Sequence, residues 1–233
     1  MLFMHAAGLE NSDFSRLEIS LSGCLENYRY FRSKLEDSTR LLVLVKANAY
    51  GHGAVEFASL MEEAGADYLA VAYPIEGIEL RQAGIKSPVM VLTAGTDSFE
   101  QIINYGLEPG IPNLYSLRAL CAVLEKRGMY DFPVHIKLDT GMHRLGFVTE
   151  ELADLQEFLK TCDRVKVKSV YSHLAAADDP SSDAFTLGQI DLFKRNADIL
   201  TDTLGYKPLY HILNSAGIER FPQYQFDMVR LGI

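Results

Sequence analysis

The chain is poor in cysteine. Its 233 residues include only Cys24, Cys121 and Cys162, and no two of them form a CxxC pair. This pattern predicts neither a disulfide framework nor a zinc site, and we expect no bound metal. Reduced thiols of this kind are typical of the cytoplasm, which is the location we expect.

Positive charge and long apolar runs are also scarce. Acidic residues (31) outnumber lysines and arginines (22), so the formal net charge is -9. This argues against a nucleic-acid partner, although a small anionic cofactor can still bind through backbone amides. No apolar run reaches membrane-spanning length, and residues 1–8 have no basic residue ahead of their short apolar stretch. We therefore expect neither a membrane anchor nor a signal peptide.

What the sequence does contain is a repeated alternation of strand and helix patterns. The predicted strands are residues 41–45, 68–72, 89–92, 110–114, 134–138, 165–172, 209–213 and 228–232. The clearest predicted helices are residues 56–64, 74–83, 98–105, 116–127, 150–160 and 183–204, with a short one from Ser215. This alternation is typical of parallel sheets, because each parallel strand needs a crossover connection.

Eight strands favour a closed (β/α)8 TIM-type barrel of the α/β class over an open doubly wound sheet of about five or six strands, which stays the alternative. A further helix over residues 23–35 precedes the first strand, and no linker divides the chain, so we expect one domain over residues 1–233. The last strand pattern runs to Ile233 without the helix that should cover it. We therefore expect a chain truncated after its eighth strand.

The clearest chemical signal is a lysine at the end of the first strand. Lys46 closes the run 41–45 and is followed by a turn with two glycines around His52. In a barrel, chemistry takes place at the C-terminal ends of the strands, and burial leaves part of an amine neutral and able to condense with an aldehyde. The alternative from composition alone is a structural lysine at a strand end.

The residues around this lysine, VKANAYGHG at positions 45–53, closely resemble the pyridoxal-phosphate signature of the alanine racemase family. The resemblance implies that Lys46 binds pyridoxal 5'-phosphate covalently and serves as catalytic acid and base. It also places Tyr50 beside the cofactor phosphate.

A second block, KLDTGMHRLGF at positions 137–147, follows the fifth predicted strand. From the residues alone, a strand-end salt bridge between Asp139 and Arg144 is the plainer interpretation. The block also resembles the family, whose arginine here hydrogen-bonds the phenolic oxygen of the cofactor. The resemblance makes Arg144 a catalytic and cofactor-binding residue. It makes Lys137 a candidate for carbamylation, since the corresponding lysine is carbamylated in some members.

Two further blocks end the sixth and seventh strands. YSHLAAAD at positions 171–178 contains His173, which from the residues alone is a structural histidine. By resemblance it lies beside the cofactor ring and belongs to the catalytic set. HILNSAG at positions 211–217 places Asn214 and Ser215 at a helix start, which is a natural anion site. Barrels commonly bind phosphate after strands seven and eight, and the family uses this serine for the cofactor phosphate.

The last block, DMVRLGI at positions 227–233, resembles the family's Val-Arg-x-Gly run. The resemblance places Arg230 at the pyridine nitrogen of the cofactor, and Gly232 and Ile233 at its phosphate. A permanent cation opposite this nitrogen keeps it unprotonated and weakens the ring as an electron sink, which suits simple reprotonation at the substrate Cα.

The resemblance runs from about residue 17 to residue 233 and implies a racemase that interconverts L- and D-alanine, the latter for peptidoglycan. Family members form homodimers, in which a β-rich C-terminal domain supplies a second catalytic tyrosine across the interface. This piece alone is therefore expected to be inactive or weakly active. Three alternatives stay open: a non-catalytic single-barrel protein of pyridoxal-phosphate homeostasis, a racemase of another amino acid such as serine or lysine, and an interaction module without a ligand.

Overall fold

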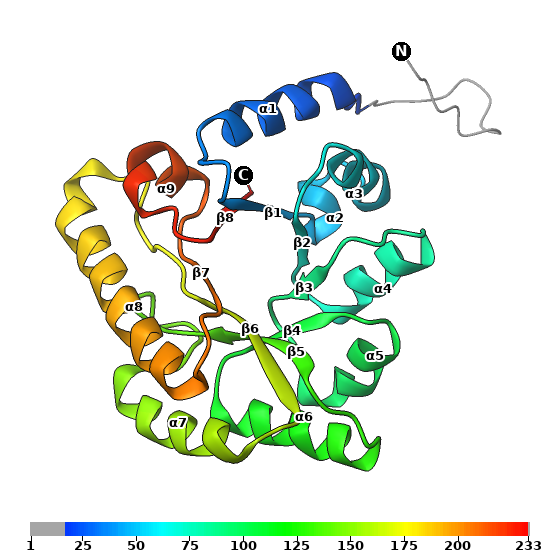
Figure 1. Ribbon diagram of the computed structural model, residues 1–233. Coiled ribbons are helices and arrows are strands. Elements are labelled where there is room, and N and C mark those ends of the chain that lie inside the picture. Colours follow the sequence, from blue (N-terminus) through cyan, green and yellow to red (C-terminus); the bar gives the residue numbers. More distant parts are fainter. Residues whose placement is uncertain (1–16, 233) are drawn as a thin grey trace.

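Eight parallel strands form a nearly closed barrel in the computed structural model, which describes residues 17–232 (Figure 1). They pair in the order β7-β6-β5-β4-β3-β2-β1-β8. Two backbone hydrogen bonds join the seam between β7 and β8, from Asp227 N to Tyr210 O (3.2 Å) and from Arg230 N to Leu213 O (3.0 Å). The TIM-type barrel predicted from the sequence is confirmed. The strands are β1 (Arg40–Leu44), β2 (Tyr68–Val71), β3 (Val89–Val91), β4 (Glu108–Ile111), β5 (Phe132–Lys137), β6 (Val165–Tyr171), β7 (Leu209–His211) and β8 (Met228–Leu231).

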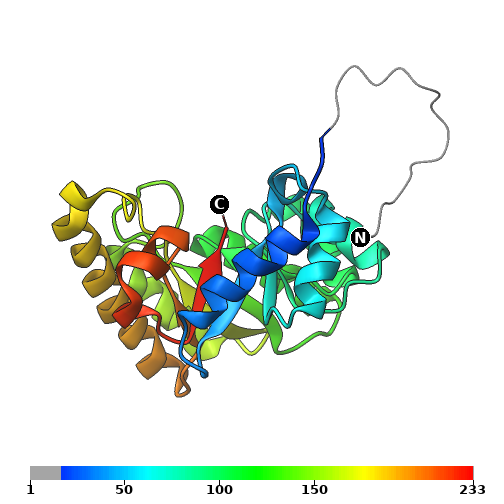
Figure 2. The same cartoon turned by 90° about the horizontal axis from the view of Figure 1, so that it is seen from above.

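Helices surround the barrel (Figures 1 and 2). In the described part of the chain, none is long and apolar enough to cross a membrane. The α-helices are α1 (Leu21–Ser33), α2 (Lys46–Tyr50), α3 (Ala54–Glu63), α4 (Pro74–Gln82), α5 (Phe99–Asn104), α6 (Leu114–Lys126), α7 (Leu152–Thr161), α8 (Asp183–Leu204) and α9 (Ser215–Arg220). Short 3-10 helices are η1 (Thr96–Ser98), η2 (Thr149–Glu151), η3 (Pro180–Ser182) and η4 (Pro222–Tyr224).

The largest boundary error concerns the fourth strand. The fourth strand was expected over residues 110–114, but β4 ends at Ile111 and Leu114 already begins α6. The reason is a helix cap: the side chain of Asn113 accepts a hydrogen bond from Ser116 N (2.9 Å). This bond satisfies one of the free amides at the helix start and fixes where α6 begins.

The helix α1 lies outside the barrel, between α9 and α3 and next to β1 and β8 (Figures 1 and 2). Its Tyr28 is buried in the same apolar cluster as Val229 of β8. An ion pair between Lys34 Nζ and Glu219 (3.0 Å) links the end of α1 to α9. A helix that precedes the barrel therefore packs beside the last strand, where a following helix was expected.

The barrel interior divides into an apolar half and a polar half. Side chains alternate along each strand, so one set faces the helices and the other faces the barrel axis. The inward apolar set comes mainly from the first three strands and comprises Leu42, Leu44, Tyr68, Ala70, Met90, Tyr171 and Met228. The buried polar residues of the later strands are His135, Lys137, Ser169, His211 and Arg230.

A bulge in β6 brings polar side chains of β5 and β6 opposite each other. Val134 pairs with Val167, but the next residue of β5, His135, pairs with Ser169. Lys168 is therefore an extra residue on β6, and its side chain is exposed. Regular pairing without a bulge would instead place Lys168 opposite His135.

Candidate active site

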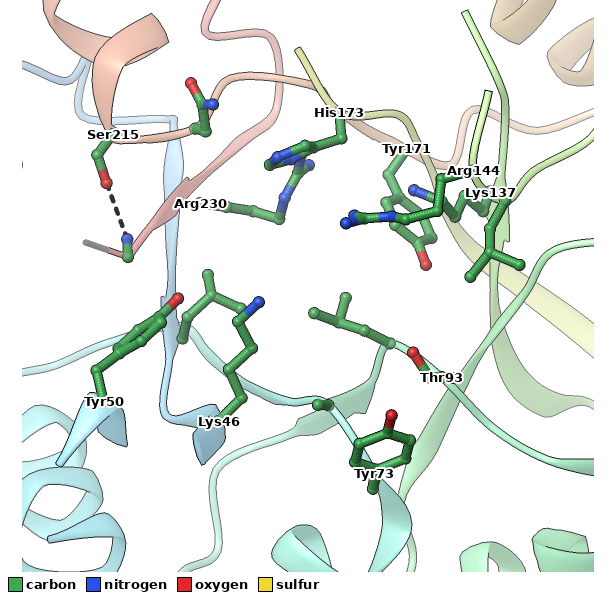
Figure 3. Close-up of a pocket in the computed structure, with 16 residues that line it drawn as sticks. Lys46, Tyr50, Tyr73, Thr93, Lys137, Arg144, Tyr171, His173, Ser215 and Arg230 are labelled. Carbon is green, nitrogen blue, oxygen red and sulfur yellow. Dashed lines mark hydrogen bonds between the residues drawn. The ribbon is translucent and has the colours of Figure 1, made fainter. Parts of the chain in front are cut away.

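A cavity of about 560 Å³ lies at the C-terminal ends of the strands (Figure 3). Pockets for small molecules usually measure roughly 300–1,000 Å³, so the volume suits such a ligand. Ile233, a predicted site residue, lies outside the described residues. The other predicted site residues all line this cavity: Lys46, Tyr50, Lys137, Arg144, His173, Asn214, Ser215, Arg230 and Gly232.

Lys46 and Tyr50 enter the cavity from a turn of unusual handedness. Four successive residues are left-handed, with φ of 52° at Ala47, 54° at Asn48, 48° at Ala49 and 56° at Tyr50. The helix α2 is therefore a left-handed turn. It places Lys46 Nζ 5.8 Å from the centre of the Tyr50 ring, with both side chains directed into the cavity (Figure 3).

Neighbouring elements stabilise this turn. Left-handed backbone costs about 1–2 kcal/mol for each residue other than glycine, so it persists only where surrounding contacts hold it. Glu76 of α4 accepts a hydrogen bond from Ala47 N (2.7 Å), and Asn48 Oδ1 accepts one from Ala54 N at the start of α3 (2.8 Å). This strained turn thus directs the side chains of Lys46 and Tyr50 into the same cavity.

One wall of the cavity is a polar cup formed by Tyr50, Ser215 and Gly232. Ser215 begins α9, and its Oγ accepts a hydrogen bond from Gly232 N (3.0 Å). Asn214 caps the same helix by accepting from Gly217 N (3.0 Å). A Cβ on Gly232 would lie only 2.9 Å from the Tyr50 hydroxyl. Glycine at this position therefore leaves room for the Tyr50 hydroxyl to approach the backbone of β8.

Positive charge gathers around the cavity. Lys46, Lys137, Arg144 and Arg230 line it, and none of the described lining residues is Asp or Glu. Burial, together with the charges of Arg230 and Arg144, lowers the pKa of Lys137 to about 8. A substantial fraction of this amine is therefore neutral slightly above physiological pH. An acidic protein thus concentrates cations in one cavity, which suits an anionic ligand.

Arg144 reaches the cavity from the loop that follows β5 (Figure 3). The salt bridge to Asp139 that the sequence left open is not made. Asp139 instead accepts hydrogen bonds from the amides of Gly141 and His143 (both 3.0 Å) and lies 3.5 Å from His143 Nδ1. Burial alone would raise the pKa of Asp139, but these hydrogen bonds hold it below its ordinary value. Asp139 therefore shapes the loop, and Arg144 points toward the cavity centre.

His173 lies against Arg230, with Nδ1 3.3 Å from the guanidinium Nη2. Burial and the charges of Arg230, Lys137, Arg144 and Lys46 lower the pKa of His173 to about 3. The imidazole is therefore neutral at physiological pH. It accepts a hydrogen bond from Arg230 and adds no further positive charge to the cavity.

Arg230 is the buried centre of the site. Its hydrogen-bond acceptors are neutral: the carbonyl oxygens of Ser172 (2.6 Å), His211 (3.1 Å) and Ile212 (3.1 Å), and the ring nitrogens of His211 (3.0 Å) and His173 (3.3 Å). Burial lowers the pKa of Arg230 to about 10, which still leaves it cationic at neutral pH. The site thus holds a desolvated positive charge that a bound ligand can contact.

A chain of hydrogen bonds leads from Arg230 through the barrel interior. A guanidinium only donates, so His211 Nδ1 must accept from it and the His211 proton lies on Nε2. His211 Nε2 then donates to Ser169 Oγ (2.8 Å), Ser169 donates to His135 Nδ1 (2.7 Å), and His135 Nε2 donates to Glu108 (2.9 Å). In this arrangement each ring nitrogen has a partner, with a cation at one end of the chain and a carboxylate at the other.

The sequence matches known proteins along most of its length. The model of the family described as alanine racemase, N-terminal domain, matches residues 19–233. The chain belongs to the alanine racemase family. It is 37% identical to the alanine racemase of Synechocystis sp. and to alanine racemase 1 of Oceanobacillus iheyensis, in each case over 93% of this chain. It spans 58% of the length of each of these two relatives.

Solved alanine racemases share the fold. The Clostridium difficile alanine racemase in complex with cycloserine superposes with a TM-score of 0.84 at 33% identity, over 91% of this chain and 58% of that one. The Bartonella henselae alanine racemase with covalently bound pyridoxal phosphate gives a TM-score of 0.82 at 27% identity, over 92% of this chain and 60% of that one. The barrel architecture is therefore that of the alanine racemases.

Within this alanine racemase barrel, some lining residues escaped prediction. Tyr171 is fully buried, its ring stacks on His211 (centroids 5.2 Å apart), and its hydroxyl has no hydrogen-bond partner among the described residues. Its Oη would lie 2.5 Å from a Cβ on Gly110, so this glycine makes room for it. Tyr73 and Thr93 follow β2 and β3. Position at a strand end was the only signal for these residues, because their side-chain types indicate no particular chemistry.

We expect Ser169→Ala to destabilise the protein by roughly 1–3 kcal/mol for each buried group left without a partner, here His211 Nε2 and His135 Nδ1. The free energy of unfolding in urea measures this. Thr186→Val is the matched control, because the Thr186 hydroxyl is equally buried but has no hydrogen-bond partner among the described residues. Equal effects of the two substitutions would contradict the chain from Arg230 to Glu108.

Proposed function

We propose that this chain is the pyridoxal-phosphate-binding domain of an amino-acid racemase, and that the whole protein acts on alanine. One observation carries the proposal: a single cavity combines the Lys46 amine, the polar cup and the buried Arg230 cation. An aldehyde-bearing phosphate ester with a basic ring nitrogen needs these three kinds of partner.

The residues present fit this cofactor. Lys46 would hold it covalently, and the polar cup with Asn214 and the Ile233 amide would hold its phosphate. Arg230 would donate to the pyridine nitrogen, Arg144 to the phenolic oxygen, and His173 would lie beside the ring. When bound, the cofactor accepts electron density from the substrate Cα as its proton is removed.

In this proposal the protein's own residues position and move a proton. Lys46 Nζ takes the proton from one face of the substrate Cα and returns it there. Arg230 supplies a permanent positive charge at the ring nitrogen, and the neutral His173 supports it as an acceptor. By family resemblance, a tyrosine outside this chain serves the other face of the substrate.

Lys137 is proposed as a carbamylation site. A carbamate forms on a neutral amine, and the pKa of Lys137 is lowered to about 8 by burial and by the neighbouring arginines. The modification would replace a positive charge beside Arg144 with a negative one. It would thereby relieve the crowding of cations on this wall of the cavity.

The finer aspects of function rest on the family. A homodimer, D-alanine production for peptidoglycan and a cytoplasmic location are proposals for the whole protein. The alternatives are a non-catalytic protein of cofactor homeostasis and a racemase of another amino acid. The experiments below separate cofactor binding from catalysis, so each can fail independently of the other.

We expect pyridoxal phosphate to label Lys46. The purified chain is mixed with the cofactor and reduced with borohydride, and its peptides are analysed by mass spectrometry. Lys46→Arg keeps the charge but cannot condense with the aldehyde, so its label should be lost while the protein stays folded. Labelling of another lysine, with Lys46 unmodified, would contradict the proposal.

We expect the polar cup to govern affinity for the phosphate. Ser215→Ala should weaken cofactor binding by about 1–3 kcal/mol, because one hydrogen bond to a charged acceptor is lost. Gly232→Val should weaken it more, since the first carbon of its side chain already meets the Tyr50 hydroxyl. Fluorescence titration with pyridoxal phosphate measures both. An unchanged affinity in Gly232→Val would rule out this wall as the phosphate site.

We expect one-sided proton exchange rather than full racemisation. In heavy water the cofactor-loaded chain should incorporate deuterium at Cα of D-alanine, the enantiomer that the family's lysine faces. Inversion should be slower by about 10²–10⁴-fold, the usual contribution of a general acid or base. Proton NMR follows exchange, and chiral chromatography follows inversion. Equal rates would place a second base in this chain, with Tyr50 and His173 as suspects, whereas a labelled Lys46 without any exchange would favour the non-catalytic alternative.

A further inference from the structure

Two cysteines that lie far apart in sequence meet on the outer surface of the barrel. Cys121 lies in the middle of α6, and Cys162 follows the last residue of α7. Their Sγ atoms are 3.3 Å apart, although 41 residues separate them in sequence. Both line a surface depression of about 440 Å³, so a small reagent can reach them. Sequence spacing predicted no pairing of cysteines, because only the fold brings these two helices together.

The local backbone allows the two sulfurs to come closer. A disulfide requires about 2.05 Å between sulfurs, so the present gap must shorten by a little over 1 Å. Cys121 is held within a helix, whereas Cys162 follows the last residue of α7 and has extended backbone angles (φ −97°, ψ 112°). The backbone of Cys162 is therefore less constrained by helical geometry than that of Cys121.

The two thiols differ in their surroundings. The two sulfurs are in hydrogen-bond contact, in which either thiol could donate. This contact and the backbone amides of Arg164 and Val165 lower the pKa of Cys162. The shared proton and burial raise the pKa of Cys121. The amides of Arg164 and Val165 favour a thiolate at Cys162. Among the described residues, Cys121 has no such amides nearby, because those of α6 bond to preceding carbonyl oxygens of the helix. Cys162 is thus the nucleophile, and Cys121 is positioned to resolve it.

A metal does not explain this pair. Zinc prefers four ligands, and in the described part of the chain no group of three or more His, Cys, Asp or Glu side chains could hold an ion. Two thiols in contact, without further ligands, suit a two-electron oxidation instead.

We propose that Cys121 and Cys162 form an oxidation site that a peroxide closes to an intrachain disulfide and a small thiol reopens. The Cys162 thiolate attacks one oxygen of hydrogen peroxide, the O–O bond breaks, and the departing hydroxide takes up a proton to become water. Cys121 then attacks the Cys162 sulfenic acid, the S–O bond breaks, and a second water leaves with the Cys121 proton. The sulfur pair loses two electrons and the peroxide gains them.

The disulfide would act on stability and leave the cofactor site unchanged. Cys162 precedes β6, whose opposite end leads to His173 at the cavity. The closed loop also contains β5 and Arg144, so the cross-link restricts a long segment of the unfolded chain. Capture by Cys121 would in addition protect Cys162 from irreversible oxidation to the sulfinic acid.

The test uses the reduced chain, treated with a small excess of hydrogen peroxide, blocked with iodoacetamide and digested without reductant. Mass spectrometry should find a peptide in which Cys121 and Cys162 are cross-linked, while Cys24 stays alkylated. Dithiothreitol should reverse the link. Oxidation should raise Tm by roughly 5–15 °C, as expected for closing a loop of this length.

Matched variants complete the experiment. Cys24→Ser should leave the cross-link unchanged, whereas Cys121→Ser should convert Cys162 to sulfinic acid under the same conditions. Free Cys121 and Cys162 after peroxide has oxidised methionines, a link through Cys24, or a lower Tm on oxidation would each overturn the proposal. Labelling of Lys46 by pyridoxal phosphate should be the same in both redox forms, so this test does not depend on the proposed function.

Discussion

A buried guanidinium that can only donate hydrogen bonds determines much of this molecule. Arg230 lies inside the barrel without a carboxylate acceptor, and an unsolvated cation is tolerated only where acceptors surround it. Three backbone carbonyl oxygens at the ends of β6 and β7 accept some of its hydrogen bonds, and two imidazole nitrogens accept the others. Because His211 Nδ1 must accept from Arg230, the His211 proton lies on Nε2. This fixes the direction of the hydrogen bonds that end at Glu108. A single side chain thus orients hydrogen-bonding groups on five strands of the barrel.

The unequal filling of the barrel follows from this constraint. Polar side chains facing the axis would be costly if they were isolated, so they are grouped where they can bond to one another. The first three strands contribute mainly aliphatic side chains, which supply a dry wall on the other side. The bulge that accommodates Lys168 keeps Ser169 opposite His135, so that the hydroxyl links two rings whose nitrogens would otherwise lack partners. Strand pairing, and not only side-chain identity, therefore determines whether the interior is satisfied.

The sequence was sufficient to predict most of the fold, and the predicted site residues within the described part of the chain line one cavity. Alternating strand and helix patterns predicted the barrel, and the block around Lys46 predicted which strand end carries the amine. The boundary before Leu114 failed because a local cap at Asn113 outweighed an apolar pattern. The left-handed turn, the chain to Glu108 and the contact between Cys121 and Cys162 could not be predicted, since each depends on atoms brought together by tertiary structure. Resemblance names residues and their roles, whereas hydrogen-bond direction and pKa require coordinates.

The charge distribution also connects ligand binding to stability. Four cations line a cavity without an acidic lining residue among those described. Burial, and then the mutual repulsion of these charges, lowers the pKa values of Lys137 and His173. This repulsion opposes folding in the absence of a ligand, because the unfolded chain separates these charges in water. An anionic group placed between Lys46 and the polar cup would remove part of that cost. A ligand that binds only the folded state stabilises it in proportion to its affinity. The cluster of cations that opposes folding is therefore also the feature that favours an anionic ligand.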